Sequence, residues 1–378
     1  MNKVYITAHS SISALGNGNA ESIESLKANR INIYRPSMDE KFKLPYFMVD
    51  GIPSDKNVRT KCAEITLELL RHIEDKWTRF SSMPVYIATS TGGIKETEEI
   101  YTELVKTGKK YPLSEKHYFY DIREAIKEQY GGRIGRIVST FTSACSSAGH
   151  SLLHAFRLIQ NGTLERALVI GTDALSLTTL IGFNALKLVS IKGTKPMTLE
   201  RDGLSIGEGG GIVLLESKPG FEPVGEIVAI HSNTDGYHLT APNASGTHQT
   251  ECISRVMEAA GLKPEDIDYI NAHGTGTPIN DEIELKVIKG LFDKVPVSSL
   301  KGFTGHTLGS SALTELCLVI EMLKAGRIYV PENIGTSMDE VYVPDRSFDL
   351  KVRHFIKNSF GFGGNNVSFL VKNMISGR

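Results

Sequence analysis

Two halves of this chain repeat the same alternation of strand-like and helix-like segments. Continuous apolar runs such as residues 166–171 stand between amphipathic helical patterns. The second half starts near Pro223 and repeats the order strand, helix, strand, helix, strand with little sequence identity. Continuous apolar strands are typical of a sheet that is buried on both faces. The alternation therefore predicts a layered α/β fold of two related halves, residues 1–222 and 223–378.

Length and charge limit the partners that we expect. The 378 residues include 42 Lys and Arg and 43 Asp and Glu, which gives a formal net charge of −1. This balance does not favour nucleic acid or an anionic membrane as a partner. The N-terminus lacks the pattern of a secretory signal, and no run approaches the roughly 18 apolar residues of a membrane span. We therefore expect a cytoplasmic protein without a membrane span.

The four cysteines show no metal or disulfide motif, because Cys62, Cys145, Cys252 and Cys317 are far apart. This usage fits a reducing compartment. Cys145 differs from the others because it lies between a strand-like run and a helical pattern, in VSTFTSACSSAGHSLLHAF, residues 138–156. A helix N-terminus favours a thiolate, which predicts a reactive cysteine. An isolated cysteine is more often a buried structural residue, so other residues must support this interpretation.

Two histidines lie in similar turns of the second half. His273 opens HGTGTP after the strand-like residues 269–272, and His306 lies in KGFTGHTLG after residues 296–299. Sites in open α/β sheets form beyond the carboxyl ends of strands, where one thiol and two imidazoles can meet. This combination predicts a nucleophilic cysteine site. Metal binding by the same three side chains is the alternative, although the usual ligand spacings are absent.

The glycine-rich segment GEGGG, residues 207–211, has two interpretations. It could form a phosphate cradle, but a strand-like run at residues 212–215 follows where a phosphate motif needs a helix. We interpret it as a tight turn that lets the backbone pack close to the site.

Four segments carry a resemblance to a known family: TSACSSAGHSL, HGTGTPINDEIE, LKGFTGHTLGSSA and NSFGFGG, in this order. Together they resemble the elongating β-ketoacyl-acyl-carrier-protein synthases (KAS I/II type) and their polyketide- and aryl-polyene-type ketosynthase relatives. The resemblance implies a thiolase-like five-layer α-β-α-β-α sandwich of two duplicated halves. It also implies the activity of a 3-oxoacyl-acyl-carrier-protein synthase. Such an enzyme condenses an acyl chain with malonyl-acyl-carrier protein, with loss of CO2, in fatty acid or specialised polyene or polyketide synthesis.

The resemblance also assigns roles to the residues that match the motifs. Cys145 would hold the acyl chain, and His273 and His306 would bind the malonyl thioester carbonyl and stabilise the enolate. Lys301 would form a buried pair with Glu284 that orients the imidazoles.

Four further residues receive roles in binding. Phe362 would act as a gate, and its N–H would form an oxyanion hole with that of Cys145. Thr275 and Thr277 would hydrogen-bond the pantetheine arm. Thr91 stands where a bulkier apolar residue often limits the acyl pocket, so we expect it to line a deeper pocket.

The resemblance implies acyl carrier protein as a partner and a homodimer or a ketosynthase heterodimer as the assembly. It implies no resident cofactor, because phosphopantetheine arrives on the carrier. Asn271, Glu284 and Glu315 match a structural cation site of some members. Lys357 stands where a small polar residue is usual, so we expect no metal here.

Two other classes remain as alternatives. A non-elongating, chain-length-factor-like partner subunit of a ketosynthase heterodimer would lack the nucleophile, whereas Cys145 is present. A degradative thiolase would use a second cysteine as base, and a starter condensing enzyme would carry Asn at the position of His306. Residues 95–130 do not contain sequence typical of the family. We expect helices there that cover the site or line a subunit interface.

Overall fold

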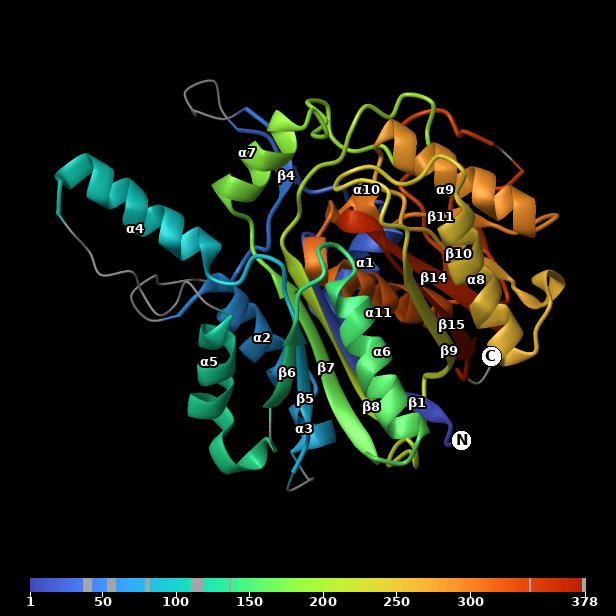
Figure 1. Cartoon of the computed structure of the whole chain (residues 1–378), viewed down its shortest axis with the longest axis horizontal. Coiled ribbons are helices and arrows are strands. Elements are labelled where there is room, and N and C mark those ends of the chain that lie inside the picture. The colour runs from blue at the N-terminus through green and yellow to red at the C-terminus, as the bar shows by residue number, and fades with distance from the viewer. Residues whose placement is uncertain are drawn as a thin grey trace.

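The computed structural model describes residues 1–36, 43–52, 59–78, 82–109, 119–135, 137–339 and 341–375. An 11-stranded mixed sheet runs in the order β11–β10–β14–β15–β9–β1–β8–β7–β5–β6, and β2 pairs with β1 (Figure 1). Its strands are β1 (Val4–Ser13), β2 (Gly16–Asn17), β5 (Val85–Ala88), β6 (Ile137–Phe141), β7 (Arg166–Asp173), β8 (Gly209–Glu216), β9 (Gly225–Thr234), β10 (Tyr269–Asn271), β11 (Val297–Ser298), β14 (His354–Gly361) and β15 (Asn365–Asn373). Two further pairs are β3 (Ile33–Tyr34) with β4 (Tyr46–Phe47) and β12 (Arg327–Ile328) with β13 (Phe348–Asp349).

The two groups of five strands in this sheet have the same connectivity. In the first group β5 is parallel to β6 and β7, and β8 is antiparallel to β7 and β1. In the second group β10 is parallel to β11 and β14, and β15 is antiparallel to β14 and β9. The groups join where β1 pairs with β9 around Val4 and Ile6. The predicted α/β fold with a repeated order is therefore confirmed, while a domain boundary after residue 222 stays a prediction.

Five layers of helices and strands pack against three buried hydrophobic clusters. One lies between the first strand group and the outer helices α2 and α5, and another lies between the second group and α8 and α9. The third surrounds α6 and α11, which contact strands of both groups. The helices are α1 (Asn19–Lys27), α2 (Lys61–His72), α3 (Glu74–Trp77), α4 (Ile94–Thr107), α5 (Tyr120–Tyr130), α6 (Ser147–Gln160), α7 (Leu177–Ala185), α8 (Thr247–Ala260), α9 (Pro278–Leu291), α10 (Lys301–Thr304) and α11 (Ser311–Lys324). None of the helices in the described ranges is long and apolar enough to cross a membrane.

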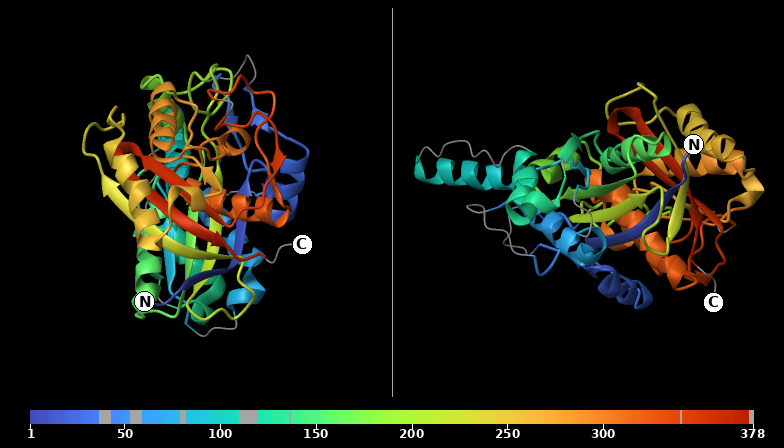
Figure 2. Two further views of the ribbon diagram at one scale, coloured as in Figure 1. Left: turned by 90° about the vertical axis from the view of Figure 1, so that its right-hand side faces the viewer. Right: turned by 90° about the horizontal axis from the view of Figure 1, so that it is seen from below.

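The segment at residues 95–130, where helices were expected, contains α4 and α5. Residues 110–118 lie outside the described part of the chain. Helix α4 extends away from the sheet (Figures 1 and 2), and its Tyr101 and Val105 side chains are 65% and 68% exposed. Its expected role in covering the site or forming a subunit interface stays a prediction.

Gly209–Gly211 of the glycine-rich segment are the first residues of β8, and Gly207 forms a bridge with Phe47, so the segment does not form the expected turn. A Cβ atom built on Gly211 would lie 2.5 Å from the carbonyl carbon of Leu313 and 2.6 Å from the nitrogen of Thr314, both in α11. Glycine inside a strand often marks such a close approach of another backbone. The absent side chain lets α11 pack directly on β8, which brings Glu315 of this helix near the site.

We predict that Gly211→Ala lowers the free energy of unfolding by about 1–3 kcal/mol, because the added methyl group forces α11 away from β8. Equilibrium urea unfolding measures the change. The matched control is Gly290→Ala in α9, where an added Cβ meets no atom within 4 Å. Alanine in a helix is favoured over glycine by about 0.5–1 kcal/mol, so this control should be stable. Equal stabilities of both variants would contradict the close approach.

Candidate active site

Cys145 lies in the turn that connects β6 with the N-terminus of α6. The Ser143 N–H donates to Ser147 Oγ at 2.9 Å, and Ser147 Oγ donates to the Ala144 carbonyl at 2.6 Å. Ala144 has a φ of 51°, which is uncommon for a residue other than glycine. Ser359 Oγ of β14 donates to the Cys145 carbonyl at 3.1 Å and ties the turn to the second strand group. These bonds hold the cysteine in a defined place at the start of the helix.

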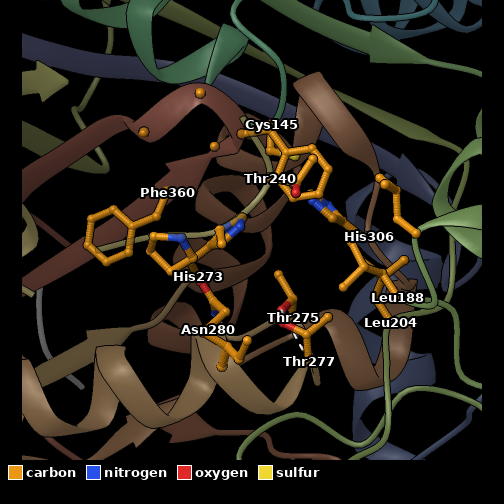
Figure 3. A pocket seen from close by; sticks show the side chains of 18 of the residues that line it. Cys145, Leu188, Leu204, Thr240, His273, Thr275, Thr277, Asn280, His306 and Phe360 are labelled. Atoms are coloured by element: carbon orange, nitrogen blue, oxygen red, sulfur yellow. Dashed lines mark hydrogen bonds between the residues drawn. The ribbon is translucent and has the colours of Figure 1, made fainter. Parts of the chain in front are cut away.

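Cys145, His273 and His306 line one cavity of about 430 Å³, and Figure 3 shows their side chains around it. The two imidazole ring centres are 5.4 Å apart and the rings are nearly perpendicular, at 81°. Nδ1 of His306 lies 3.0 Å from Ser311 Oγ, while its Nε2 has no hydrogen-bond partner among the described residues. If the Ser311 hydroxyl donates to Nδ1, the ring proton is on Nε2. The structure thus brings together the three residues that the sequence singled out.

Both imidazoles are neutral near pH 7. Burial lowers the pKa of His273 and of His306 well below the ordinary value, and the Lys301 charge acts in the same direction. A neutral imidazole offers one N–H donor and carries no charge. The cavity therefore provides hydrogen-bond donors for a developing negative charge without binding an anion as an ion pair.

The thiol of Cys145 is also neutral in the free protein. Burial raises the pKa of Cys145 to about 11, although the Lys301 charge and the backbone N–H of Phe362 act in the opposite direction. The expectation that the helix N-terminus produces a thiolate is therefore wrong for the free protein. A helix N-terminus contributes only about half a charge, and burial of the sulfur outweighs it.

Lys301 pairs with Glu315, which corrects the expected pairing with Glu284. Lys301 Nζ lies 2.6 Å from Glu315 Oε1 and donates to the His273 carbonyl at 2.5 Å. Glu284 instead accepts the N–H groups of His273 and Gly274 at 2.8 and 2.9 Å. The close packing of α11 on β8 explains the difference, because it carries Glu315 to the lysine. Glu315 stands in the apolar run SALTELCLVIEMLK, and a buried charge of this kind needs a partner, which is the signal that could have identified it.

The residues that match a structural cation site do not fit a bound cation in this chain. Lys357 Nζ lies 2.7 Å from Glu315 Oε2, 2.8 Å from the Asn358 carbonyl and 3.4 Å from the Ala272 carbonyl. An ammonium group thus contacts the Glu315 carboxylate that a cation would use, and Glu284 accepts backbone N–H groups. The side-chain oxygen of Asn271 has no hydrogen-bond partner among the described residues. In the described ranges there is no group of three or more His, Cys, Asp or Glu side chains that could hold a metal.

Phe362 follows β14 and lines the cavity. Its ring stacks on Phe183 from α7 at a centroid distance of 5.3 Å and an angle of 24°. Gly363 and Gly364 have φ angles of 77° and 73°, which glycine adopts readily. The chain therefore turns immediately after the ring, as a hinged gate requires, although gating itself stays a prediction.

Thr275 and Thr277 line the same cavity, and their hydroxyl oxygens are 2.8 Å apart. Thr91 does not line it. The Thr91 hydroxyl and N–H both donate to Asp173 Oδ1, at 2.7 and 2.8 Å. Its place in the acyl pocket stays a prediction, and the cavity beside Cys145 does not extend to it.

Several residues that the sequence did not reveal also line the cavity. They come from separate helices, strands and loops, and only Asn280 and Phe360 lie within the motifs quoted above. They are Phe183, Leu188, Leu204, Thr240, Asn280 and Phe360.

Two family models match the chain. The model for the beta-ketoacyl synthase N-terminal domain matches residues 132–219, and the model for the C-terminal domain matches residues 224–335. The 3-oxoacyl-acyl-carrier-protein synthase 2 of Synechocystis is 34% identical over 310 residues, which cover 76% of this chain and 74% of the relative. The protein of the same name from Staphylococcus aureus is 30% identical over 313 residues, 76% of each chain.

Solved structures show the same fold. A beta-ketoacyl synthase from Burkholderia phymatum has a TM-score of 0.84 at 25% identity and covers 99% of this chain and 100% of that one. A ketosynthase in complex with its chain length factor, from Xenorhabdus doucetiae, has a TM-score of 0.85 at 24% identity and covers 98% of each chain. A type II polyketide ketosynthase in complex with its acyl-carrier protein has a TM-score of 0.87 at 23% identity, over 98% of this chain and 99% of that one. These likenesses confirm the predicted thiolase-like fold.

The pKa of about 11 predicts how Cys145 responds to alkylation. Because only the thiolate reacts, the rate with iodoacetamide should rise about tenfold per pH unit from pH 7 to pH 10. Peptide mass mapping of samples quenched over time measures the rate at this one cysteine. Cys62, Cys252 and Cys317 are internal controls, since all are buried, have raised pKa values and lie outside the cavity. A rate that levels off by pH 8 would show that the free protein stabilises the thiolate.

Proposed function

The chain belongs to the β-ketoacyl synthase family, and on this premise we propose that it catalyses decarboxylative condensation as a 3-oxoacyl-acyl-carrier-protein synthase. An acyl group on Cys145 reacts with malonyl-acyl-carrier protein to give 3-oxoacyl-acyl-carrier protein and CO2. The observation that carries the proposal is one thiol and two neutral imidazoles on the same cavity. Condensation of this type needs a nucleophile and stabilisation of an enolate, and it needs no hydride or metal.

The first step transfers the acyl group from a carrier thioester to Cys145. The cysteine sulfur forms a bond to the thioester carbonyl carbon, and the bond from that carbon to the carrier sulfur breaks. The thiol proton goes, in net, to the released carrier thiol. The backbone N–H groups of Phe362 and Cys145 lie close enough to the cysteine sulfur to act against the rise of its pKa. In this proposal they bind the thioester carbonyl oxygen during the transfer.

The second step uses both imidazoles. The bond from the malonyl carbon to its carboxyl group breaks, CO2 leaves, and the electron pair moves onto the thioester carbonyl oxygen. Donors on His273 and His306 stabilise this enolate oxygen. The enolate carbon then bonds to the acyl carbon on Cys145, and the bond from that carbon to the cysteine sulfur breaks. The sulfur leaves as a thiolate and takes up one proton from water, which restores the neutral thiol.

Lys301 and Glu284 hold His273 from opposite sides. The lysine donates to the carbonyl of His273, and the glutamate accepts its backbone N–H. In this proposal they are positioning residues, and the Lys301 charge also keeps the imidazoles neutral. Thr275 and Thr277 have hydroxyl groups on the cavity that suit the amides of a pantetheine arm.

The proposal also includes acyl carrier protein as a partner and a dimeric assembly. It further includes the absence of a resident cofactor and a cytoplasmic location. Two of the related structures are complexes, one with an acyl-carrier protein and one with a chain length factor. All four cysteines of this chain are free thiols, which fits a reducing compartment. A role as a chain-length-factor-like subunit is less well supported, because that class lacks the nucleophile that Cys145 supplies.

We predict that His273→Ala and His306→Ala each lower the rate of malonyl-carrier decarboxylation by about 10²–10³, the usual effect of losing one oxyanion donor. Acylation of Cys145 should be affected less, because the imidazoles act on the malonyl group. Release of labelled CO2 and intact mass measure the two steps.

The matched control is His354→Ala, at the end of β14 away from the cavity, which should retain both steps. Cys145→Ala should lose condensation and still release CO2. Normal decarboxylation by either imidazole variant would show that the role assigned to that histidine is wrong.

A further inference from the structure

Four charged side chains lie buried behind the two histidines. Lys301, Lys357, Glu284 and Glu315 are each at most 1% exposed. They come from α10, β14, α9 and α11, so the cluster connects four elements. Two ammonium and two carboxylate groups give a formal charge of zero. Buried charges persist only when they are paired or hydrogen-bonded. Both lysines pair with Glu315, whereas Glu284 accepts backbone N–H groups.

Glu315 is the centre of this cluster because both lysines contact it. Lys301 binds Oε1 at 2.6 Å and Lys357 binds Oε2 at 2.7 Å. The lysines also contact two consecutive backbone carbonyls. Lys301 donates to the carbonyl of His273, and Lys357 donates to the carbonyl of Ala272. The backbone at the active histidine is thus held by two ammonium groups that share one carboxylate.

We propose that Lys357 is a positioning residue for decarboxylation. Its ammonium group takes the place of a bound cation and holds both Glu315 and the Ala272 carbonyl. Its ammonium also completes the balance of charge behind His273 and His306. The inference rests on the proposed function, because its readout is the release of CO2 from a malonyl thioester.

The charge of Lys357 has a consequence for the imidazoles. Lys301 and Lys357 both lower the pKa of His273 and of His306. The pKa of Lys357 itself is lowered by burial to about 8, so this group stays charged at pH 7. Without Lys357, one of the two ammonium groups that lower the pKa values of these imidazoles is lost, and Lys301 and Glu315 remain as one ion pair.

The loss of this positive charge favours protonation of the imidazoles and raises their pKa. A protonated imidazole beside the malonyl carboxylate stabilises the substrate more than the transition state, which slows the loss of CO2. Removal of Lys357 should therefore move the acid limb of the pH–rate profile to higher pH. A change that only loosens the structure would lower the rate without moving this limb.

The test compares Lys357→Met, which removes the ammonium, with Lys357→Gln, which keeps a donor for Glu315 without the charge. The control is Lys372→Met, at an exposed position of the neighbouring strand β15. For each full-length variant, kcat and KM for malonyl-carrier decarboxylation are measured across pH, together with the rate of Cys145 alkylation and the thermal unfolding midpoint.

We expect Lys357→Met to lower kcat about 10–100-fold, a loss typical of groups that orient the residues of a site, with little change in KM. Lys357→Gln should retain more activity, and both variants should shift the acid limb upward. The alkylation rate of Cys145 should stay at the wild-type value, because Lys357 does not contact this thiol. The Lys372→Met control should match wild type in every measurement.

Wild-type kinetics and an unshifted acid limb in both variants would overturn the inference. If Lys357→Met does not fold, the pH–rate profile of Lys357→Gln tests the inference, and an unshifted acid limb in this variant overturns it. If neither variant folds, Lys357 is required by the fold and the positioning role is rejected. Failure of the wild-type protein to decarboxylate would instead contradict the proposed function, so the two failures are distinguishable.

Discussion

The shared carboxylate of Glu315 connects the fold of this protein to its chemistry. Glycine at position 211 lets α11 approach β8, and this approach brings the carboxylate under the histidine loop. There it pairs with Lys301 and Lys357, which in turn hold the carbonyls of His273 and Ala272. A small residue in one strand thus determines where the backbone of an active histidine lies.

Burial determines the protonation state of every reactive group in the cavity. It keeps both imidazoles neutral and keeps the Cys145 thiol protonated, despite the helix N-terminus and the nearby Lys301 charge. Desolvation commonly exceeds the effect of a helix terminus. Lys187 and Asp235 line the cavity, whereas the buried side chains of the Lys301, Lys357, Glu284 and Glu315 cluster lie behind the imidazoles. Such an arrangement suits a reaction in which negative charge develops on a carbonyl oxygen.

The sequence predicted the alternating elements, their duplicated order and the meeting of Cys145, His273 and His306, because strand ends and short motifs are local features. It did not predict which buried carboxylate pairs with Lys301, since that depends on the distance between α11 and β8. For the same reason residues 207–211 were interpreted as a turn. Contacts between distant segments set both outcomes.

The most direct test of the account is the intact mass of the protein after incubation with acyl-acyl-carrier protein, followed by addition of malonyl-acyl-carrier protein. The account predicts a gain of one acyl group, located on the peptide that contains Cys145. This gain should disappear when malonyl carrier is added, as 3-oxoacyl-carrier protein forms. An acyl group on another residue, or one that malonyl carrier does not remove, would contradict the assignment of Cys145 as the nucleophile of a condensing enzyme.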